Sequence, residues 1–251
     1  MTQALRKFSP ISSTPAYKMV AEAIERDILA GRLRDGDALG TETELAAQFG
    51  VNRSTVRESI RLLEHGGLIR RDSSRRLWIG VPHTDGLATR MSRALVLHEV
   101  SFRELYEAAM ALQLATIEAA VEHATASEIS ALERNIGETE RALGDPAAVA
   151  KLDGEFHTLV GKASHNRVLQ LAREPSELLV ISSTELILSK IKEGAPRLLQ
   201  AHRMYLDAIR RADKDAAREW VRRHVNDWRK GFERAGNDLD QPIDRIVLQN
   251  G

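Results

Sequence analysis

The stretch from Gly40 to Ile69, GTETELAAQFGVNRSTVRESIRLLEHGGLI, decides the fold of the N-terminal part of this chain. Thr41 and Glu44 have the spacing of a capping box, in which the hydroxyl accepts an N–H of the first turn and the glutamate reaches back to the capping residue. A helix is therefore predicted to begin there and to end at Gly50, because glycine adopts the left-handed conformation that closes a helix. Asn52 then predicts the N-cap of a second helix after a tight turn.

The second predicted helix has an apolar side and a basic flank. Val56, Ile60 and Leu63 share one side, while arginines recur every four residues on a neighbouring stripe that includes Arg57 and Arg61. The second helix of a helix-turn-helix enters the major groove by its N-terminus, and an arginine fork fits guanine edges or phosphate. A surface hairpin with a solvated basic face has the same local pattern, so the flanking sequence decides between the two. The predicted DNA contacts on this helix are Arg53, Ser54, Thr55 and Arg57.

The flanking segments complete a winged helix. Apolar residues from Tyr17 to Ile28 trace one face of a helix that ends near Gly31. Residues 68–71 and 77–79 predict two short strands around a polar turn, which form the wing. We therefore predict a tail over residues 1–14 and a winged-helix DNA-binding domain over residues 15–80. Two wing arginines, Arg75 and Arg76, are added to the predicted DNA contacts.

Residues 21–69 resemble the winged-helix head of the GntR transcription regulators, which typically reads x-x-E-x-x-L-A-x-x-x-G-V-x-R-x-x-V-R-E around the turn. The resemblance covers about a quarter of the chain. It implies that Arg53 and Arg57 contact DNA and that Thr55 contacts a phosphate or a base. The chain departs from the family at Gly40, where proline is common, and in the wing, where Ser73 to Arg76 replace a glycine-rich turn. The wing is therefore the part of the head that the resemblance supports least.

Charge and composition agree with DNA binding by the first domain. The 251 residues contain 36 basic and 36 acidic side chains, but residues 1–80 carry a net charge of +3, and residues 51–76 contain seven arginines against three acids. The chain has no cysteine, which excludes disulfides and thiolate metal sites. It has neither the apolar core of a signal peptide nor an apolar run long enough to span a bilayer, so we expect a cytoplasmic protein with no membrane partner.

The remainder of the chain predicts a helical bundle. Residues 81–86 are expected to form a linker, residues 87–235 a helical domain, and residues 236–251 a tail whose isoleucines, valine and leucine could dock, beginning with Ile243. Apolar residues recur at spacings of three and four throughout the helical domain, and its breaks delimit six or seven antiparallel helices. The predicted fold class is mainly α: an N-terminal winged helix-turn-helix followed by this bundle. Ser182 to Thr184 could line a pocket or simply tolerate a polar surrounding, and the second is favoured.

Four polar residues lie at positions of this bundle where apolar residues are expected. Asp153 and His157 are one turn apart on the face of Phe156, whereas His202 and His224 interrupt the apolar stripes of two later helices. A single core histidine is usually a hydrogen-bonded structural residue. Burying all four without partners would cost roughly several kcal/mol, whereas one shared cation satisfies them together. The residues therefore predict a site for a divalent metal ion such as Zn, Ni, Mn or Fe.

The same residues resemble a second family pattern. LDGEFHTLVGKASHN, AHRMYLDAI and AREWVRRHV are similar to the ligand segments of the FCD effector domain, found in the FadR-type branch of GntR regulators. The resemblance implies that Asp153 and the three histidines hold the metal and that a small carboxylate effector completes its coordination. Many members carry an arginine near the position of Ala109 that can clamp the effector's acid group, and this chain does not. The effector pocket is expected to include Ala109, Gln113 and Asn166.

Taken with the family pattern, these features favour a transcription regulator over an enzyme. We expect a homodimeric repressor that binds an inverted-repeat operator, because a two-fold dimer requires a two-fold site. Its operator affinity would be controlled by a small organic acid at the metal. Two alternatives remain open: a metal-dependent hydrolase-like enzyme, since three histidines and an aspartate could activate water, and a regulator whose polar pocket holds no metal.

Overall fold

The computed structural model describes residues 14–74, 76–80 and 84–243, with the side chains of residues 84–90 and 178 not described. Contacts divide the chain into two compact units, with the boundary in the sequence between residues 83 and 84. Residues 81–83 of the expected linker lie outside the described residues. Thr84 to Gly86, which we also expected in the linker, form the first turn of a helix of the second unit.

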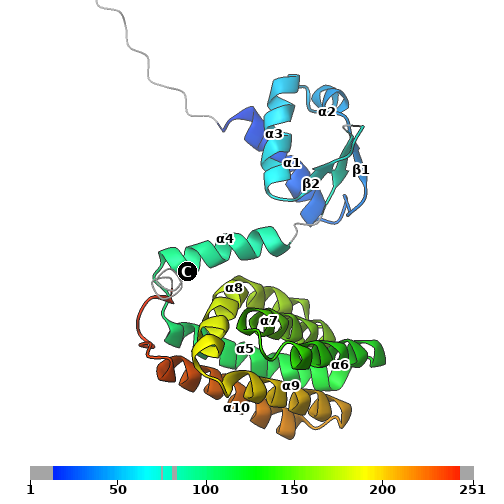
Figure 1. Ribbon diagram of the computed structural model, residues 1–251. Coiled ribbons are helices and arrows are strands. Elements are labelled where there is room, and N and C mark those ends of the chain that lie inside the picture. Colours follow the sequence, from blue (N-terminus) through cyan, green and yellow to red (C-terminus); the bar gives the residue numbers. More distant parts are fainter. Residues whose placement is uncertain (1–13, 75, 81–83, 244–251) are drawn as a thin grey trace, which may run out of the picture. The chain divides into compact units, whose positions relative to one another are not determined.

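The first unit is a winged helix (Figure 1). Its helices are α1 (Ala16–Leu29), α2 (Glu42–Phe49) and α3 (Arg53–His65), and its strands are β1 (Ala38–Gly40), β2 (Ile69–Arg71) and β3 (Leu77–Ile79). The strands form an antiparallel sheet in the order β1-β3-β2, with Ile69 opposite Ile79 and Arg71 opposite Leu77. The sequence predicted β2 and β3 but not β1, because a three-residue strand is too short to show an alternation of apolar and polar residues.

The structure confirms the local signals that predicted the helix-turn-helix. The backbone N–H of Thr41 donates to Glu44 Oε2 over 2.7 Å, and the N–H of Glu44 donates to Thr41 Oγ1 over 3.3 Å. Gly50 ends α2 in the left-handed region with φ +63°. Asn52 Oδ1 accepts the N–H of Thr55 over 2.7 Å and caps α3. Each such cap contributes about 1 kcal/mol, so the turn is held from both sides.

The core of the first unit fixes the orientation of α3. Val56 and Ile60 have no exposed surface and pack against Val20 and Ile24 of α1 in one cluster. The buried Ser59 hydroxyl is 2.8 Å from the carbonyl oxygen of Tyr17, which ties α3 to the start of α1. One side of α3 is thereby committed to the core, and the side that carries the arginines remains exposed.

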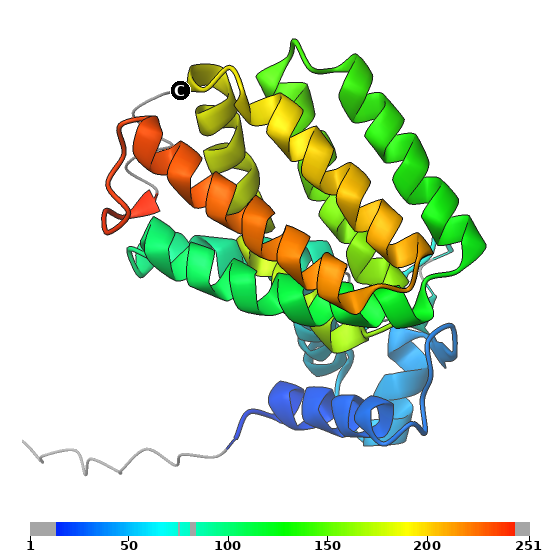
Figure 2. The same ribbon diagram turned by 90° about the horizontal axis from the view of Figure 1, so that it is seen from below.

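The second unit is a bundle of seven helices within the described residues, which confirms the predicted six or seven. They are α4 (Thr84–Leu97), α5 (Phe102–His123), α6 (Ala126–Arg141), α7 (Pro146–Ala163), α8 (Arg167–Lys190), α9 (Gly194–Arg210) and α10 (Lys214–Arg234). Figure 2 shows α5 and α10 side by side. The two helices are antiparallel, because successive residues of α5 form hydrogen bonds with earlier and earlier residues of α10. These pairs are Tyr106 with Asn226, Glu118 with Arg218 and Glu122 with Lys214. None of the helices described has the length and apolar character needed to cross a bilayer.

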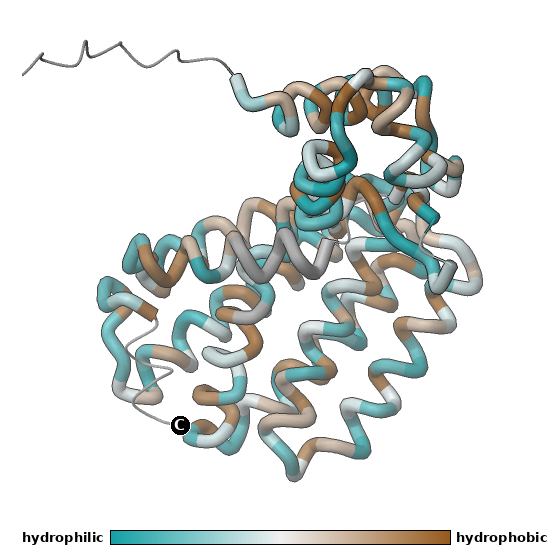
Figure 3. Tube along the Cα trace, turned by 90° about the horizontal axis from the view of Figure 1, so that it is seen from above, coloured by the Kyte–Doolittle hydropathy of each residue, from teal (hydrophilic) through white to brown (hydrophobic). Residues whose placement is uncertain are grey.

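The bundle has an apolar interior and a second cluster at one end. Brown and teal segments alternate along its helices in Figure 3, as expected where only one side is buried. At one end of the bundle, Leu239 and Ile243 pack with Phe102 and Phe232. The backbone of Pro242 also pairs with Ser101 in an isolated bridge. The expected docking of the tail is thus seen for Ile243, while Ile246, Val247 and Leu248 lie outside the described residues.

Helix α8 approaches two of its neighbours through glycines. A Cβ placed on Gly154 of α7 would lie 2.9 Å from Ile181 Cδ1, and one placed on Gly231 of α10 would lie 2.7 Å from Ile187 Cγ2. Real Cβ atoms do not approach other atoms so closely, so neither position accommodates a larger residue without a shift. Helix α8 also contains Pro175, whose carbonyl oxygen accepts a hydrogen bond from the Ser92 hydroxyl of α4.

Candidate functional site

The predicted DNA contacts on α3 are displayed at its N-terminal end. Arg53, Ser54 and Arg57 are exposed, and Thr55 is half-buried. The hydroxyl of Ser54 donates to Asn52 Oδ1 over 2.7 Å, the same atom that caps the helix. This end of α3 therefore presents two guanidiniums together with the N–H groups of a helix N-terminus, a combination that suits phosphate and base edges.

Glu42 of α2 contacts both α3, the helix that carries the predicted DNA contacts, and the sheet. Its Oε2 lies 3.5 Å from Arg57 Nε, and its Oε1 accepts hydrogen bonds of 3.1 and 3.2 Å from Arg71 of β2. Arg71 also donates to Glu64 of α3 over 3.0 Å. Burial opposes ionisation of Glu42, but the two arginines outweigh it and lower the pKa of the carboxyl. The glutamate thus remains ionised and pairs closely with Arg71, while its contact with the exposed Arg57 is long.

The wing turn is organised by Asp72. Its Oδ1 accepts the hydroxyl of Ser74 and the backbone N–H groups of Ser74 and Arg76, and its Oδ2 accepts Trp78 Nε1 over 2.9 Å. Hydrogen bonds from Ser74 and Trp78 are the main causes that lower the pKa of Asp72 to about 2. A side chain therefore shapes this turn, which explains how it forms without the glycines usual in the family. Arg76 is exposed on the wing, and Arg75 lies outside the described residues.

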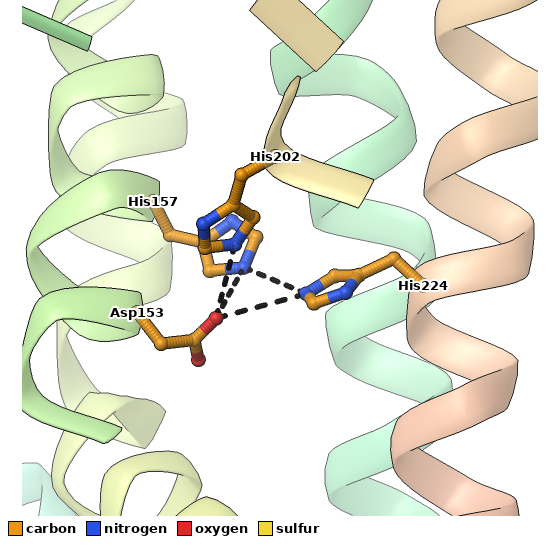
Figure 4. A group of neighbouring side chains, drawn as sticks. All are labelled: Asp153, His157, His202 and His224. Atoms are coloured by element: carbon orange, nitrogen blue, oxygen red, sulfur yellow. Dashed lines mark hydrogen bonds and ion pairs between the residues drawn. The ribbon is translucent and has the colours of Figure 1, made fainter. Parts of the chain in front are cut away.

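The four predicted metal ligands meet at the centre of the bundle (Figure 4). Asp153 and His157 come from α7, His202 from α9 and His224 from α10. Asp153 Oδ1 lies 3.1 Å from Nε2 of His202, 3.6 Å from that of His157 and 3.8 Å from that of His224. The Nε2 atoms of His157 and His224 are 3.2 Å apart, and all four candidate ligand atoms lie within 4.8 Å of one another. The structure thus brings together residues that the sequence separates widely.

The donor atoms of this cluster fit a shared cation. Ligand atoms bound at about 2.1 Å to one ion are separated by roughly 3.0 to 3.5 Å when adjacent. Asp153 Oδ1 and both ring nitrogens of His202 are buried, and none has a hydrogen-bond partner of acceptable geometry among the described residues, although Oδ1 and His202 Nε2 are close. Leaving such atoms unpaired is costly, whereas a cation at the focus of the four side chains would satisfy Asp153 Oδ1 and one ring nitrogen of His202 together. The side chains present therefore match a divalent metal.

Electrostatics keep the cluster ready for a cation at neutral pH. Burial lowers the pKa of His157 well below its usual value, and it is the main cause that lowers the pKa of His224 to about 4. Burial opposes ionisation of Asp153, but the neighbouring imidazoles outweigh it and lower the pKa of that carboxyl. The cluster therefore offers an anionic oxygen at Asp153 and neutral imidazoles at His157 and His224, which are the protonation states that metal ligands require.

Aromatic residues orient the imidazoles. Phe156 stacks on His202 with ring centroids 3.7 Å apart and an interplanar angle of 9°. The buried Tyr205 is one turn from His202, and its hydroxyl donates to Gln113 Oε1 over 3.4 Å. Burial and the negative charge of Asp153 raise the pKa of Tyr205 well above its usual value, so the phenol remains a neutral hydrogen-bond donor.

A cavity opens beside three of the four proposed ligands. Ala109 and Gln113 line it together with Asp153, His157 and His224, so two of the three expected pocket residues are in place. The third is not. Asn166 caps α8, where its Oδ1 accepts the N–H groups of Val168 and Leu169 over 3.0 and 3.2 Å, and it borders a separate surface hollow. The expectation that Asn166 lines the effector pocket is therefore corrected: its polar oxygen is already used by the helix end.

Several cavity residues escaped the sequence analysis. Thr184 of α8 lines the cavity, contrary to the interpretation that was favoured for its segment. Trp228 of α10 also lines it, and its buried Nε1 has no hydrogen-bond partner among the described residues. Arg173 of α8 lines an adjoining small cavity with Gln113 and His157. An arginine in a polar helical stretch resembles a surface residue, and only the packing of α8 shows that this one is buried.

Comparisons with known proteins agree with this architecture. The chain matches the family model described as "Bacterial regulatory proteins, gntR family" over residues 16–78 and the FCD domain over residues 104–227. It belongs to the GntR family of transcription regulators and carries a C-terminal FCD domain. Its head implies DNA binding, and its FCD domain implies a small-molecule effector.

The similar proteins are also regulators. An uncharacterized HTH-type transcriptional regulator of Bacillus subtilis, YdhC, is 28% identical over 216 residues, which cover 85% of this chain and 89% of that protein. The HTH-type transcriptional repressor NanR of Salmonella schwarzengrund is 24% identical over 86% of this chain and 84% of the repressor. A solved structure, a Streptococcus agalactiae GntR protein, superposes with a TM-score of 0.59 at 24% identity over 85% of this chain and 99% of that one, which supports the fold alone. The chain is thus a transcription regulator and not an enzyme.

Proposed function

We propose that this protein is a metal-dependent repressor whose operator affinity is controlled by a small carboxylate bound at the bundle centre. Asp153, His157, His202 and His224 would hold one divalent ion, with Zn, Ni, Mn and Fe all compatible with nitrogen and oxygen ligands. The observation that supports this most directly is the convergence of four buried side chains from three helices, whose candidate ligand atoms all lie within 4.8 Å of one another. Two of these atoms, Asp153 Oδ1 and His202 Nε2, have no hydrogen-bond partner among the described residues.

The effector class follows from the donor set. Four protein ligands leave about two positions on an octahedral ion, and carboxylate oxygens are hard anionic donors suited to such positions. The adjoining cavity, with Gln113 and Trp228 in its wall, offers room beside the ligands and hydrogen-bonding groups to orient the acid. A bound metal would supply positive charge for anchoring the acid, while the protein side chains determine its orientation.

DNA recognition would involve Arg53, Ser54, Thr55 and Arg57 of α3, supported by Arg75 and Arg76 of the wing. We propose that two chains form a homodimer and that each head reads one half of an inverted repeat. The repressor role is carried over from the printed name of NanR and from the family pattern. An operator shortened to one half-site should therefore bind much more weakly than the complete repeat.

Coupling between the sites would pass through α8 and α4. Helix α8 lines the effector cavity, and its Pro175 carbonyl accepts a hydrogen bond from Ser92 of α4, the helix that follows the linker. An acid that shifts α8 would therefore move the segment leading to the head. A coupling free energy of roughly 1 to 3 kcal/mol would change operator affinity about 5- to 150-fold, and bound DNA would change acid affinity by the same factor.

The test is a titration of short organic acids into the protein–operator complex, with metal-loaded and chelator-treated protein in parallel. We expect at least one acid to change operator affinity only when metal is present, and Asp153→Ala to abolish that response. Asp207→Ala, which removes a half-exposed carboxylate of α9 that pairs with Arg211, serves as the matched control and should respond like the wild type. An acid that acts equally well after metal removal and in Asp153→Ala would replace this proposal with a metal-free pocket.

A further inference from the structure

The effector cavity has polar, apolar and charged parts in its wall. Three of the proposed ligands, Asp153, His157 and His224, line it together with the buried Thr184 of α8, and we call this part the inner end. Apolar side chains of α8, α9 and α10 also line it: Val180, Ile187, Leu188, Ile191, Leu198 and Val225. The effector therefore meets both a polar site and a hydrocarbon surface.

The cavity leads from the inner end toward the end of the bundle where α8 ends, α9 begins and α10 ends. On α10 its lining runs from His224 through Gly231 to Arg234. At 1.5 Å per residue, Gly231 lies about 10 Å along the helix from His224. Gly194 lines the cavity at the start of α9, and the preceding Glu193 has its Oε2 3.6 Å from Arg234 Nη2. The wall is thus long enough for the body of a ligand as well as its acid group.

The wall between the inner end and the opening offers few hydrogen bonds. Gly194 and Gly231 contribute no side chain, and a Cβ placed on them would lie 2.8 Å from Leu188 Cδ2 and 2.7 Å from Ile187 Cγ2. The N–H of Gly194 already donates to the carbonyl oxygen of Ile191 over 2.9 Å, and Gly231 lies inside α10, where backbone groups pair along the helix. A ligand hydroxyl placed here would lose its hydrogen bonds to water, whereas a methylene group gains by leaving water.

The opening of the cavity is charged and exposed. Three basic side chains outnumber one acidic side chain there: Arg197, Lys230, Arg234 and Asp227. Because these side chains reach water, their net positive charge attracts anions but is screened. A divalent ion at the buried inner end would attract a carboxylate more strongly than these exposed groups do. The acid group is therefore expected at the inner end and the rest of the ligand along the apolar wall.

We propose that the effector is a carboxylate with an apolar body of about four to eight carbons, the length that roughly 10 Å of wall accommodates. This inference rests on the proposed function and specifies the class of acid. Acids with hydroxylated bodies are disfavoured because the wall leaves their hydroxyls without partners. Very short acids bind weakly because they leave the apolar wall in contact with water.

The test is calorimetric titration of the metal-loaded full chain with acetate, butyrate, hexanoate and octanoate. Gluconate is the matched ligand, since it has the six carbons and single carboxylate of hexanoate but a hydroxylated body. Affinity should rise roughly three- to fourfold for each methylene added up to hexanoate. The heat-capacity change on binding should become more negative along the series. Hexanoate should bind at least about tenfold more tightly than gluconate. Affinities that are flat across the series, or tighter binding of gluconate, would overturn the inference.

A pair of variants places the body on the wall. Val180→Thr adds a hydroxyl to the wall with little change of shape, and it should weaken hexanoate binding roughly three- to tenfold while leaving acetate unchanged. Val168→Thr makes the same change at an exposed valine of α8 outside the cavity, and it should bind both acids like the wild type. If Val180→Thr also binds hexanoate like the wild type, the body lies elsewhere and the inference is wrong.

Failure of this inference and failure of the proposed function give different results. Acid binding that requires the metal but ignores chain length overturns only the apolar body. A chain-length dependence that survives chelation and Asp153→Ala overturns only the metal anchor. A metal-loaded chain that binds none of the acids overturns both.

Discussion

The head and the bundle use polar residues in opposite ways. In the head, Arg53 and Arg57 are one turn apart on a single helix and face outward, while the apolar side of that helix makes the core. In the bundle, the polar residues are themselves in the core, and His157 and His224, whose Nε2 atoms are 3.2 Å apart, are separated by 67 residues of chain. Recognition in the head can therefore be changed without loss of folding, whereas in the bundle the site and the fold share the same atoms.

Removal of one buried ligand should produce the largest effect. We expect purified wild type to carry about one divalent ion per chain and to be stabilised by roughly 3 kcal/mol at a hundredfold excess of metal over Kd. His224→Ala should abolish both the bound metal and the added stability, as measured by metal analysis and by thermal unfolding with and without chelator. His123→Ala, which removes an exposed imidazole at the end of α5, should change neither.

Wild type that is metal-free when purified, fully stable, and indifferent to added cation and chelator would contradict this expectation. The four polar residues would then belong with ordinary core residues, and the contrast between head and bundle would disappear.

Acid should destabilise the bundle more than the head, and we expect this effect to be smaller than that of removing a ligand. In folded, metal-free protein the pKa of His224 is about 4, against a usual value of 6.5. Below pH 6.5 the unfolded chain therefore binds a proton at this histidine that the folded chain does not bind. This contribution to stability is complete above pH 6.5 and is lost as the pH falls toward 4, by up to about 3 kcal/mol. The low pKa values of His157 and Asp153 act in the same direction.

The measurement is acid unfolding of metal-free protein, followed in the head by Trp78 and in the bundle by Trp220 and Trp228, using variants that keep one set of tryptophans. The bundle should unfold at a higher pH than the head. His224→Gln should flatten the dependence between pH 6.5 and 4. Equal pH midpoints in both domains would argue that the buried cluster contributes nothing to acid sensitivity.

The smallest expected change concerns DNA binding alone. Arg57→Ala should weaken operator binding by roughly 1 to 3 kcal/mol, with unchanged metal content and bundle stability. The loss should depend on operator sequence if Arg57 reads a base and be even across sequences if it holds a phosphate. Arg61→Ala is the matched control, since it lies one turn farther from the helix N-terminus and pairs with Glu58. If Arg53→Ala and Arg57→Ala both bind like wild type, α3 is not the reading helix.

How far the sequence could predict the molecule depends on the range of the interactions involved. The caps at Thr41 and Asn52 lie within a few residues of the groups they satisfy, so the helix-turn-helix could be read directly. The four buried ligands could be predicted from helical periodicity, because each interrupts an apolar face. Asn166 was misplaced because the same side chain serves either a helix cap or a pocket. Arg173 was missed because its burial arises from packing between α8 and distant helices, which no local pattern records.

Helix α8 has almost no clearance against two of its neighbours. It meets α7 at Gly154 and α10 at Gly231, at distances that leave no room for even a methyl group. These two helices carry three of the four proposed ligands, and Gly154 is adjacent to Asp153 in sequence. At these two contacts the side chains of Ile181 and Ile187 already lie against the backbone of the ligand helices, so α8 has little room to move toward them. A larger residue at Gly154 or Gly231 would push α8 away from the ligand helices. We expect such a substitution to change the response to the effector while the four ligand side chains remain the same.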